Sequence, residues 1–128
     1  MRSAVRGVKP HQRSEGDPTP GMVREQAIAT DALWSGLVRT APGMVSGWHH
    51  HGDHQTSIYV VAGVMRIESG PGGRDVVDLE ADDFCFIPPG TIHRESNLGA
   101  EENRLVVVRS GTGPPTTNVD GPEGGSGE

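Results

Sequence analysis

Short alternations of apolar and polar residues, separated by Gly- and Pro-containing turns, run through the middle of the chain. In residues 64–69, Met65 and Ile67 alternate with Arg66 and Glu68. A strand places successive side chains on opposite faces, so this period of two predicts a strand with one buried and one solvated face. The strands predicted in this way are Leu33–Thr40, Val45–His51, Thr56–Val61, Val64–Ser69, Val76–Leu79, Phe84–Ile87, Ile92–Ser96 and Arg104–Arg109.

Only Arg24–Ala32 has a pattern that could hold a helical turn. Regularly spaced short strands joined by turns such as Ala41-Pro42-Gly43 are typical of antiparallel sandwiches and barrels. We therefore expect an all-β domain over residues 22–110. Residues 1–21 and 111–128 are rich in Gly, Pro and polar residues and cannot bury enough apolar surface to offset the entropy of ordering, so they are predicted to be a flexible arm and a disordered tail.

Composition narrows the class of protein. The 128 residues carry a net charge of -6, with 11 Lys and Arg against 17 Asp and Glu, and the basic residues do not cluster. We therefore expect no nucleic-acid partner, and no apolar run is long enough to predict a membrane partner. The single cysteine, Cys85, excludes an internal disulfide and fits a reducing compartment, so a cytoplasmic location is expected.

Histidines provide the candidate chemistry. Four of the six lie within residues 49–54, and a fifth is His93. His49 and His51 share one face of a predicted strand, and His93 follows a distant Pro- and Gly-containing turn. Neutral imidazole is a common ligand of first-row transition metals. This arrangement predicts a metal site built from three histidines.

The spacing of Gly43, His49, His51 and Gly63 resembles the first motif of the cupin family. In that motif a Glu follows the second His by four or five positions. The two corresponding positions here hold Gln55 and Thr56. The resemblance thus covers the histidine pair but leaves the carboxylate position without an acid.

The segment Pro88-x-Gly90-x-x-His93-x-x-x-Asn97 is similar to the second cupin motif, with Asp82 where the family usually has Gly. Both motifs in order make the resemblance specific. It implies a double-stranded β-helix, or jelly-roll barrel, with a metal held by His49, His51 and His93. It also implies a small-molecule substrate or ligand and a homodimer.

The fourth ligand is open at this stage. Strand parity running back from Ile58 directs Thr56 inward, whereas Gln55 would need a bulge. A threonine hydroxyl is a poor ligand, and an amide oxygen can bind a divalent metal, so Gln55 is the predicted fourth ligand. His54 is the alternative.

Three histidines and a neutral fourth donor would leave the ion's charge undiminished and favour Fe(II), Ni(II), Cu(II) or Zn(II) over Mn(II). We expect an Fe(II)-dependent dioxygenase acting on a small anionic or enol-type substrate. A non-redox isomerase or lyase, a metal-free epimerase and a non-catalytic binding protein are the alternatives. Glu95 shares a strand face with His93 and could hold a ligand or carry a proton, and Tyr59 could assist as a proton donor.

Overall fold

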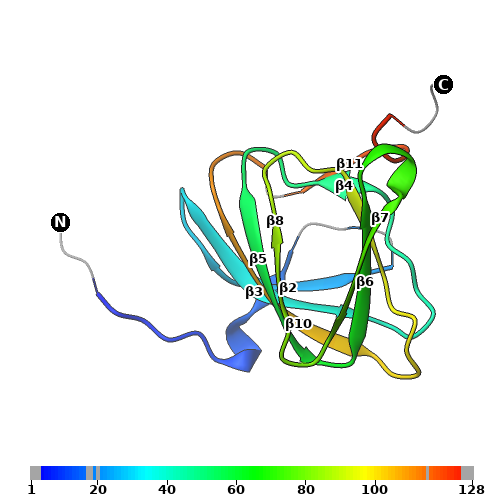
Figure 1. Ribbon diagram of the computed structural model, residues 1–128. Helices are drawn as coiled ribbons and strands as arrows, with labels where there is room; N and C mark the ends of the chain where they lie inside the picture. The colour runs from blue at the N-terminus through cyan, green and yellow to red at the C-terminus, as the bar shows by residue number, and fades with distance from the viewer. Residues whose placement is uncertain (1–3, 17–18, 20, 115, 125–128) are drawn as a thin grey trace.

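Two antiparallel sheets face each other in the computed structural model, which describes residues 4–16, 19, 21–114 and 116–124 (Figure 1). In spatial order, the six-stranded sheet consists of β1 (Ser14–Glu15), β2 (Val23–Ala29), β3 (Leu33–Thr40), β10 (Asn103–Ser110), β5 (Gln55–Ala62) and β8 (Phe84–Ile87). The five-stranded sheet consists of β11 (Thr117–Asn118), β4 (His49–His50), β9 (His93–Ser96), β6 (Val64–Ser69) and β7 (Asp75–Glu80). Two short 3-10 turns, Pro10–Gln12 and Pro71–Gly73, are the helical elements of the described residues. The expected all-β fold is confirmed.

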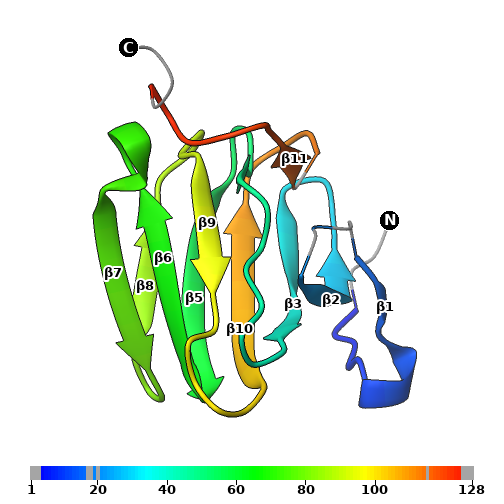
Figure 2. The same cartoon turned by 90° about the vertical axis from the view of Figure 1, so that its right-hand side faces the viewer.

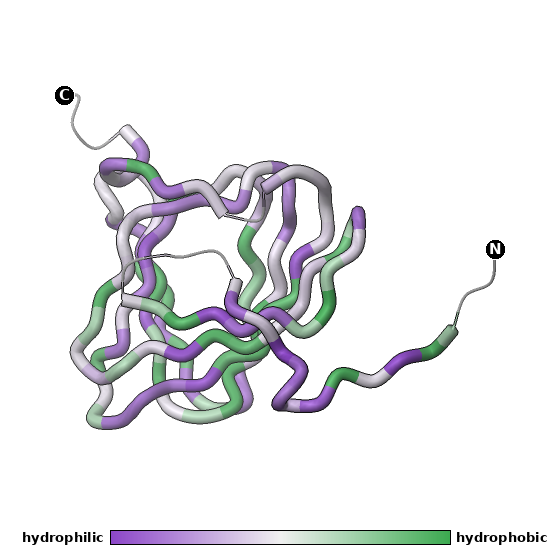
Figure 3. Tube along the Cα trace, turned by 180° about the vertical axis from the view of Figure 1, so that it is seen from behind, coloured by the Kyte–Doolittle hydropathy of each residue, from purple (hydrophilic) through white to green (hydrophobic). Residues whose placement is uncertain are grey.

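The core lies between the two sheets and is formed by the inward-facing residue of each alternating pair. On β5, for example, Ile58 and Val60 are buried while Val61 is exposed. Figure 3 shows the resulting short hydrophobic and hydrophilic stretches alternating along the strands. The buried apolar side chains are Trp34, Val38, Ile58, Val60, Met65, Ile67, Leu79, Ile87, Leu105 and Val107.

Most predicted strands agree with the observed ones, but the helical turn expected within Arg24–Ala32 is wrong. That segment forms β2, which pairs with β3 in a register that includes Glu25 opposite Leu37. The backbone of β3 needs a hydrogen-bonding partner on this side, and the long-range pairing overrides a weak local preference. Strand β4 is also shorter than predicted, because Val45 makes only an isolated bridge to Ser96.

Both chain ends contribute short pairings in the residues that the structure describes. β1 pairs with β2, and β11 pairs with β4 with Asn118 opposite His49. The C-terminal segment then crosses one end of the barrel (Figure 2). The mobility expected for residues 1–21 and 111–128 stays a prediction. Among the described residues, no helix is long and apolar enough to cross a membrane.

Candidate metal centre

Strand directions bring four metal-ligating side chains to one end of the barrel. β5 runs away from this end, and β6, joined to it by a turn at Gly63, runs back and ends at Ser69. Ser69 lies opposite His93 of β9, and His93 lies opposite His49 of β4. His49, His51, His93 and Glu95 therefore meet inside the barrel, each with at most 4% of its surface exposed.

The potential ligand atoms of these four residues all lie within 4.8 Å of one another, so the residues could hold one metal ion. The ring centroids of His49 and His93 are 4.3 Å apart, and that of His51 lies 5.2 and 5.0 Å from them. Both pairs, His49 with His51 and His93 with Glu95, are spaced by two residues. Strand alternation thus aims each pair at the same interior point.

Backbone carbonyls fix the orientation of two of the imidazoles. Nδ1 of His49 is 3.0 Å from the carbonyl oxygen of Gly47, and Nδ1 of His93 is 2.9 Å from that of Thr91. A carbonyl only accepts, so each Nδ1 carries a proton and each neutral ring keeps its lone pair on Nε2. This is the usual outer contact of a metal-binding histidine.

The two Nε2 atoms face the same carboxylate oxygen. Oε2 of Glu95 lies 3.3 Å from Nε2 of His49 and 3.2 Å from Nε2 of His93. Two lone pairs and a carboxylate oxygen repel one another unless a proton or a cation lies among them. The donor set of three imidazole nitrogens and one carboxylate is chemically suited to a divalent transition metal.

The pKa shifts of His49 and Glu95 also fit a metal site, because they favour a neutral imidazole and an ionised carboxylate. Burial lowers the pKa of His49, and the hydrogen bond and charge of Glu95 oppose this only in part. Burial alone would raise the pKa of Glu95, but the short contacts of its carboxylate with His49 and His93, whose rings attract it when they are protonated, bring that pKa well below its usual range. At neutral pH the carboxylate is ionised, which gives the cluster an anionic ligand.

Ser46 supports the cluster from outside, and sequence reasoning missed it. Its hydroxyl accepts the backbone N–H of Glu95 at 2.9 Å and donates to the Gly47 carbonyl at 2.9 Å, the carbonyl that also orients His49. Ser46 is 3% exposed. Nothing in the sequence signals this role, because it depends on the contact between Ser46 and β9.

The structure brings together the three histidines that the motifs identified and adds Glu95 to them. Glu95 was expected near the site as an orienting group or proton carrier, and it lies among the ligand atoms themselves. The first motif lacks its usual carboxylate, but Glu95 on β9, two residues after His93, brings a carboxylate to the cluster.

Gln55, the predicted fourth ligand, does not join the cluster. Its side chain is exposed and its Nε2 donates to Oγ of Ser110 at 3.2 Å. β5 and β10 pair without a bulge at this point, so strand parity turns Gln55 outward and Thr56 inward. His54 is buried, and its Nδ1 lies 2.9 Å from the carbonyl oxygen of His51, outside the four-residue group.

Tyr59 also lies away from the cluster. It is on the outer face of β5, where its hydroxyl donates to Asp82 and its ring packs against Phe84 at 4.9 Å. The hydrogen bond to Asp82 raises the pKa of Tyr59. Only a bulge at Gln55 would turn Tyr59 toward the metal site, and β5 pairs with β10 without one there, so the side chain points outward.

The wall facing the cluster is polar at this end of the barrel. Thr56 lies opposite Arg109 in the register of β5 and β10, and Arg109 lies opposite Trp34 on β3. The three side chains are 1%, 2% and 5% exposed. The guanidinium carbon of Arg109 lies 4.7 Å from the ring centroid of Trp34, and Oγ1 of Thr56 has no hydrogen-bond partner among the residues that the structure describes.

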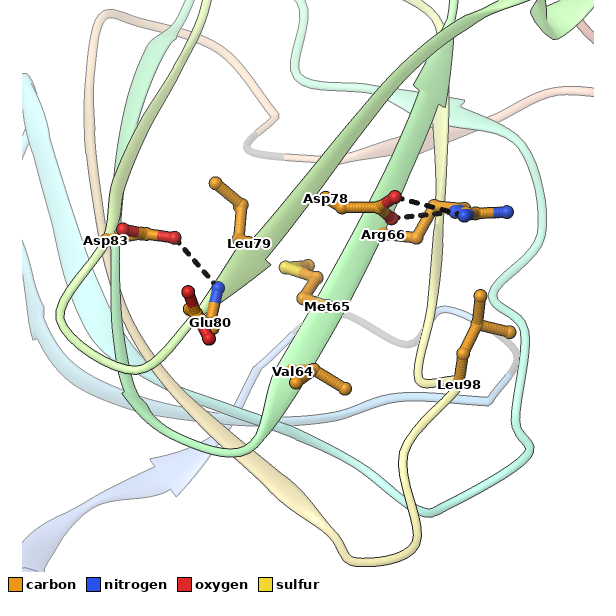
Figure 4. Close-up of a pocket in the computed structure, with 8 residues that line it drawn as sticks. All are labelled: Val64, Met65, Arg66, Asp78, Leu79, Glu80, Asp83 and Leu98. Atoms are coloured by element: carbon orange, nitrogen blue, oxygen red, sulfur yellow. Dashed lines mark hydrogen bonds and ion pairs between the residues drawn. The ribbon is translucent and has the colours of Figure 1, made fainter.

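A separate pocket of about 360 Å³ lies at the other end of β6 (Figure 4). Met65 and Leu79 form its apolar floor, and Arg66 makes an ion pair with Asp78 at 2.7 Å beside it. Val64, next to the turn at Gly63, also lines it, so this pocket is remote from His93 at the opposite end of the strand. Besides the pair of Arg66 and Asp78, the carboxylate of Asp83 accepts the backbone N–H of Glu80 at 2.9 Å.

Three comparisons show what the chain is similar to. Glucose-6-phosphate isomerase from Sinorhizobium medicae (strain WSM419) is 34% identical over 77 residues, which cover 52% of this chain and 36% of that protein. Polyketide synthase CurC from Streptomyces cyaneus is 29% identical over 110 residues, covering 86% of this chain and 69% of CurC. The solved structure of the polyketide cyclase RemF from Streptomyces resistomycificus matches with a TM-score of 0.73 at 21% identity, covering 94% of this chain and 89% of RemF.

The chain spans little more than a third of the isomerase that it matches. The match to RemF covers nearly the whole chain and agrees with the jelly-roll barrel expected from the two motifs. A family model for the cupin domain matches residues 36–109, which is more than half of the chain and includes all four residues of the cluster. The chain belongs to the cupin family.

Proposed function

We propose that the chain is a metal-dependent enzyme whose divalent cation is held by His49, His51, His93 and Glu95. One observation carries the proposal: two imidazole nitrogens and a carboxylate oxygen converge within 3.3 Å in a buried site, with the histidine N–H groups bound elsewhere. A site without a cation would leave these groups in mutual repulsion or require extra protons.

The carboxylate changes the choice of ion. With Gln55 as fourth donor, harder ions such as Mn(II) were disfavoured, whereas the oxygen of Glu95 is a donor that suits them. We propose Fe(II) or Mn(II) as the resident ion, with Zn(II), Ni(II) and Cu(II) as competitors for the same donors. One negative ligand also lowers the charge of the loaded site to about one unit for a divalent ion.

We propose a small anionic, oxygen-rich substrate. Arg109 contributes a positive charge to the wall opposite the cluster, and Thr56 contributes a hydroxyl beside it. In this position Arg109 would bind an anionic group of the substrate, and Thr56 would donate a hydrogen bond to it. Burial of both residues would exclude water and strengthen these contacts.

The reaction proposed first is a non-redox rearrangement, of the isomerase or cyclase type, at an enolisable carbonyl. A bound divalent cation would supply Lewis acidity, which lowers the cost of negative charge on a substrate oxygen. Support comes from the named activities of two similar proteins, an isomerase and a polyketide cyclase. His49, His93 and Glu95 would keep their orientation throughout, because Gly47, Thr91 and Ser46 hold them.

Dioxygenase chemistry with Fe(II) is the second candidate. The observation in its favour is the donor set, because two histidines and one carboxylate are the ligands of many non-haem Fe(II) oxygenases. The set here contains one further histidine. For either reaction we propose a cytoplasmic location, since the thiol of Cys85 is free and suits a reducing compartment.

Deuterium exchange in the absence of oxygen tests the first reaction. The purified protein is stripped with a chelator and reloaded under nitrogen with Mn(II), Fe(II) or Zn(II). It is then incubated in D2O with 2-oxo acids, sugar phosphates and β-diketones, and proton NMR follows exchange at the carbon next to the carbonyl. Glu95→Gln serves as the site variant and Gln55→Glu as the control, because Gln55 faces solvent.

We expect metal-dependent exchange or product formation without oxygen, lost in Glu95→Gln and kept in Gln55→Glu. Oxygen uptake that requires Fe(II), with no anaerobic conversion, would replace the first reaction by the second. Failure of the unmodified protein to bind any of the three ions would overturn both.

A further inference from the structure

The candidate metal centre is closed to solvent in this structure. The clustered residues and the two polar residues of the facing wall each have at most 4% of their surface exposed, and these residues are His49, His51, His93, Glu95, Thr56 and Arg109. A hydrated ion or a small-molecule substrate can therefore reach the centre only if a covering segment moves.

The C-terminal part of the chain crosses the end of the barrel at which the centre lies. β10 ends at Ser110, one residue after Arg109 of the facing wall, and β11 pairs with β4, which carries His49. The chain thus passes from one wall of the site to the other, and it then continues over the end of the five-stranded sheet (Figure 2). We call residues 116–123 of this segment the strap.

The strap is held mainly by backbone hydrogen bonds. Its two-residue strand β11 pairs with β4, and the N–H of Val119 donates to the carbonyl of Trp48 at 2.9 Å. Near its end, the carbonyl of Glu123 accepts the N–H of Gly72 at 2.9 Å. Each residue of the strap is exposed or half-buried. Since its opening would uncover little apolar surface, the strap can detach at a small cost in free energy while the core stays folded.

A second connection at the same end of the barrel is fixed more firmly. Residues 51–54 join β4 to β5, and the side chains of His51 and His54 are only 2% and 4% exposed. The carbonyl of Gly52 accepts the N–H of Gly90 at 2.8 Å, which ties this loop to the turn before β9. Movement of the loop would displace His51, a residue of the cluster, whereas movement of the strap displaces none of the four.

The strap has a flexible attachment and a rigid surface to dock on. Gly111 and Gly113 lie between β10 and the strap with φ angles of +149° and +89°, which glycine adopts far more readily than other residues. Trp48, whose carbonyl binds Val119, packs its ring so closely on Gly73 that an added Cβ there would lie 2.7 Å from Cη2 of the ring. The two places that hold the strap, β4 and the turn at Gly72, are therefore joined to each other without it.

We propose that the strap is the gate of the metal centre, which swings on Gly111 and Gly113 to admit the ion and the substrate. The proposal rests on the metal-dependent function proposed above for what passes through the gate. Because the strap contributes none of the four ligands, it should control how fast an ion enters and leaves, with little effect on the dissociation constant.

Val119 offers a matched pair of variants for the test. Val119→Pro removes the N–H that binds the carbonyl of Trp48, whereas Val119→Ala shortens the same side chain and keeps that N–H. Thr117→Gly is a milder variant, because glycine weakens the extended backbone of β11 and removes no backbone hydrogen bond. Circular dichroism checks that each variant is folded.

The first measurement needs no metal. The metal-free proteins are treated with diethyl pyrocarbonate, which modifies neutral imidazoles, and mass spectrometry gives the rate at each histidine. We expect His49, His51 and His93 to react about 10-fold faster in Val119→Pro, the effect of losing one hydrogen bond of the closed gate, and within about 2-fold of the unmodified rate in Val119→Ala. Thr117→Gly should react about 3-fold faster and decides the matter if Val119→Pro does not fold. His11, which is exposed before β1, should react equally in all variants.

The second measurement follows uptake of Mn(II) or Zn(II) and release of the ion to excess chelator. Both rates should rise about 10-fold in Val119→Pro, so the dissociation constant should stay within about 2-fold. Equal histidine modification in the unmodified protein, Val119→Pro and Thr117→Gly would overturn the gate. A dissociation constant that rises with the release rate while uptake is constant would also overturn it, because the strap would then orient the ligands. A protein that binds no ion and still shows the expected histidine modification would refute the metal-dependent function and support the strap as the cover of the site.

Discussion

Glu95→Gln is the substitution that most directly tests the metal centre. It keeps the shape of the side chain and removes the only negative charge among the four clustered residues. Because these ligand atoms lie within 4.8 Å of one another, an ion among them would lie about 3 Å from the carboxylate. At an effective dielectric constant of about 20, the attraction between charges of +2 and -1 at that distance is about 11 kcal/mol.

Hydration of the free ion offsets most of this attraction. If roughly a quarter of the attraction remains as binding free energy, removal of the carboxylate costs about 2.7 kcal/mol, and the dissociation constant of the ion rises about 100-fold. Titration against a chromophoric chelator with Mn(II) and Zn(II) measures the change. The loss should be larger for Mn(II), because the carboxylate is its preferred donor.

Two controls separate ligand loss from damage to the fold. Gln55→Glu adds a carboxylate on the solvent side of β5 and should leave affinity within about 2-fold, since an exposed charge is screened. The circular dichroism spectrum of metal-free Glu95→Gln should match that of the metal-free unmodified protein, because Gln keeps the size and shape of the side chain. Unchanged affinity in Glu95→Gln, or a gain in Gln55→Glu, would refute the assignment.

Three further outcomes follow from neighbouring contacts. Ser46→Ala removes the hydroxyl that links Glu95 to the Gly47 carbonyl, and should weaken metal affinity about 10-fold while circular dichroism is unchanged; equal affinity would contradict the linking role. Arg109→Gln should raise the KM for an anionic substrate at least 10-fold and leave metal content intact, and loss of metal instead would place Arg109 in the structure of the centre. Burial, followed by the charge of Glu95, raises the pKa of Cys85, so a bound cation should lower that pKa and speed alkylation by iodoacetamide at fixed pH; identical rates with and without metal would oppose this.

The strand pattern predicts most of this fold from sequence because each strand buries only one face. Alternation around Ile58 and Ile67 placed β5 and β6 within one residue of their observed ends. The pattern failed at Val23–Ala29, where polar and apolar residues fit either period and only pairing with β3 decides the outcome. Strand β11 was beyond prediction for the same reason, since its two residues are extended only by contact with β4.

For the candidate site, too, the sequence predicted some residues correctly and not others. The motifs located His49, His51 and His93, and parity correctly turned Thr56 inward. Because an amide oxygen is a better metal ligand than a hydroxyl, Gln55 was predicted as the fourth ligand, although this prediction required a bulge that β5 does not have. The acid of the cluster is Glu95, which lies within the second motif, two residues after His93.

All four clustered residues belong to one sheet or to the turn that leaves it. His49 and His51 at β4 and His93 and Glu95 on β9 form two pairs of the same spacing, and the contact of His49 with His93 across the strands joins them. In the family motif the acid lies at the position that Gln55 or Thr56 occupies here, at the start of β5. Moving the acid to β9 leaves the facing wall, with Thr56 and Arg109, without a metal ligand. In the proposed function that wall recognises the substrate, and the positive charge of Arg109 favours a negatively charged one.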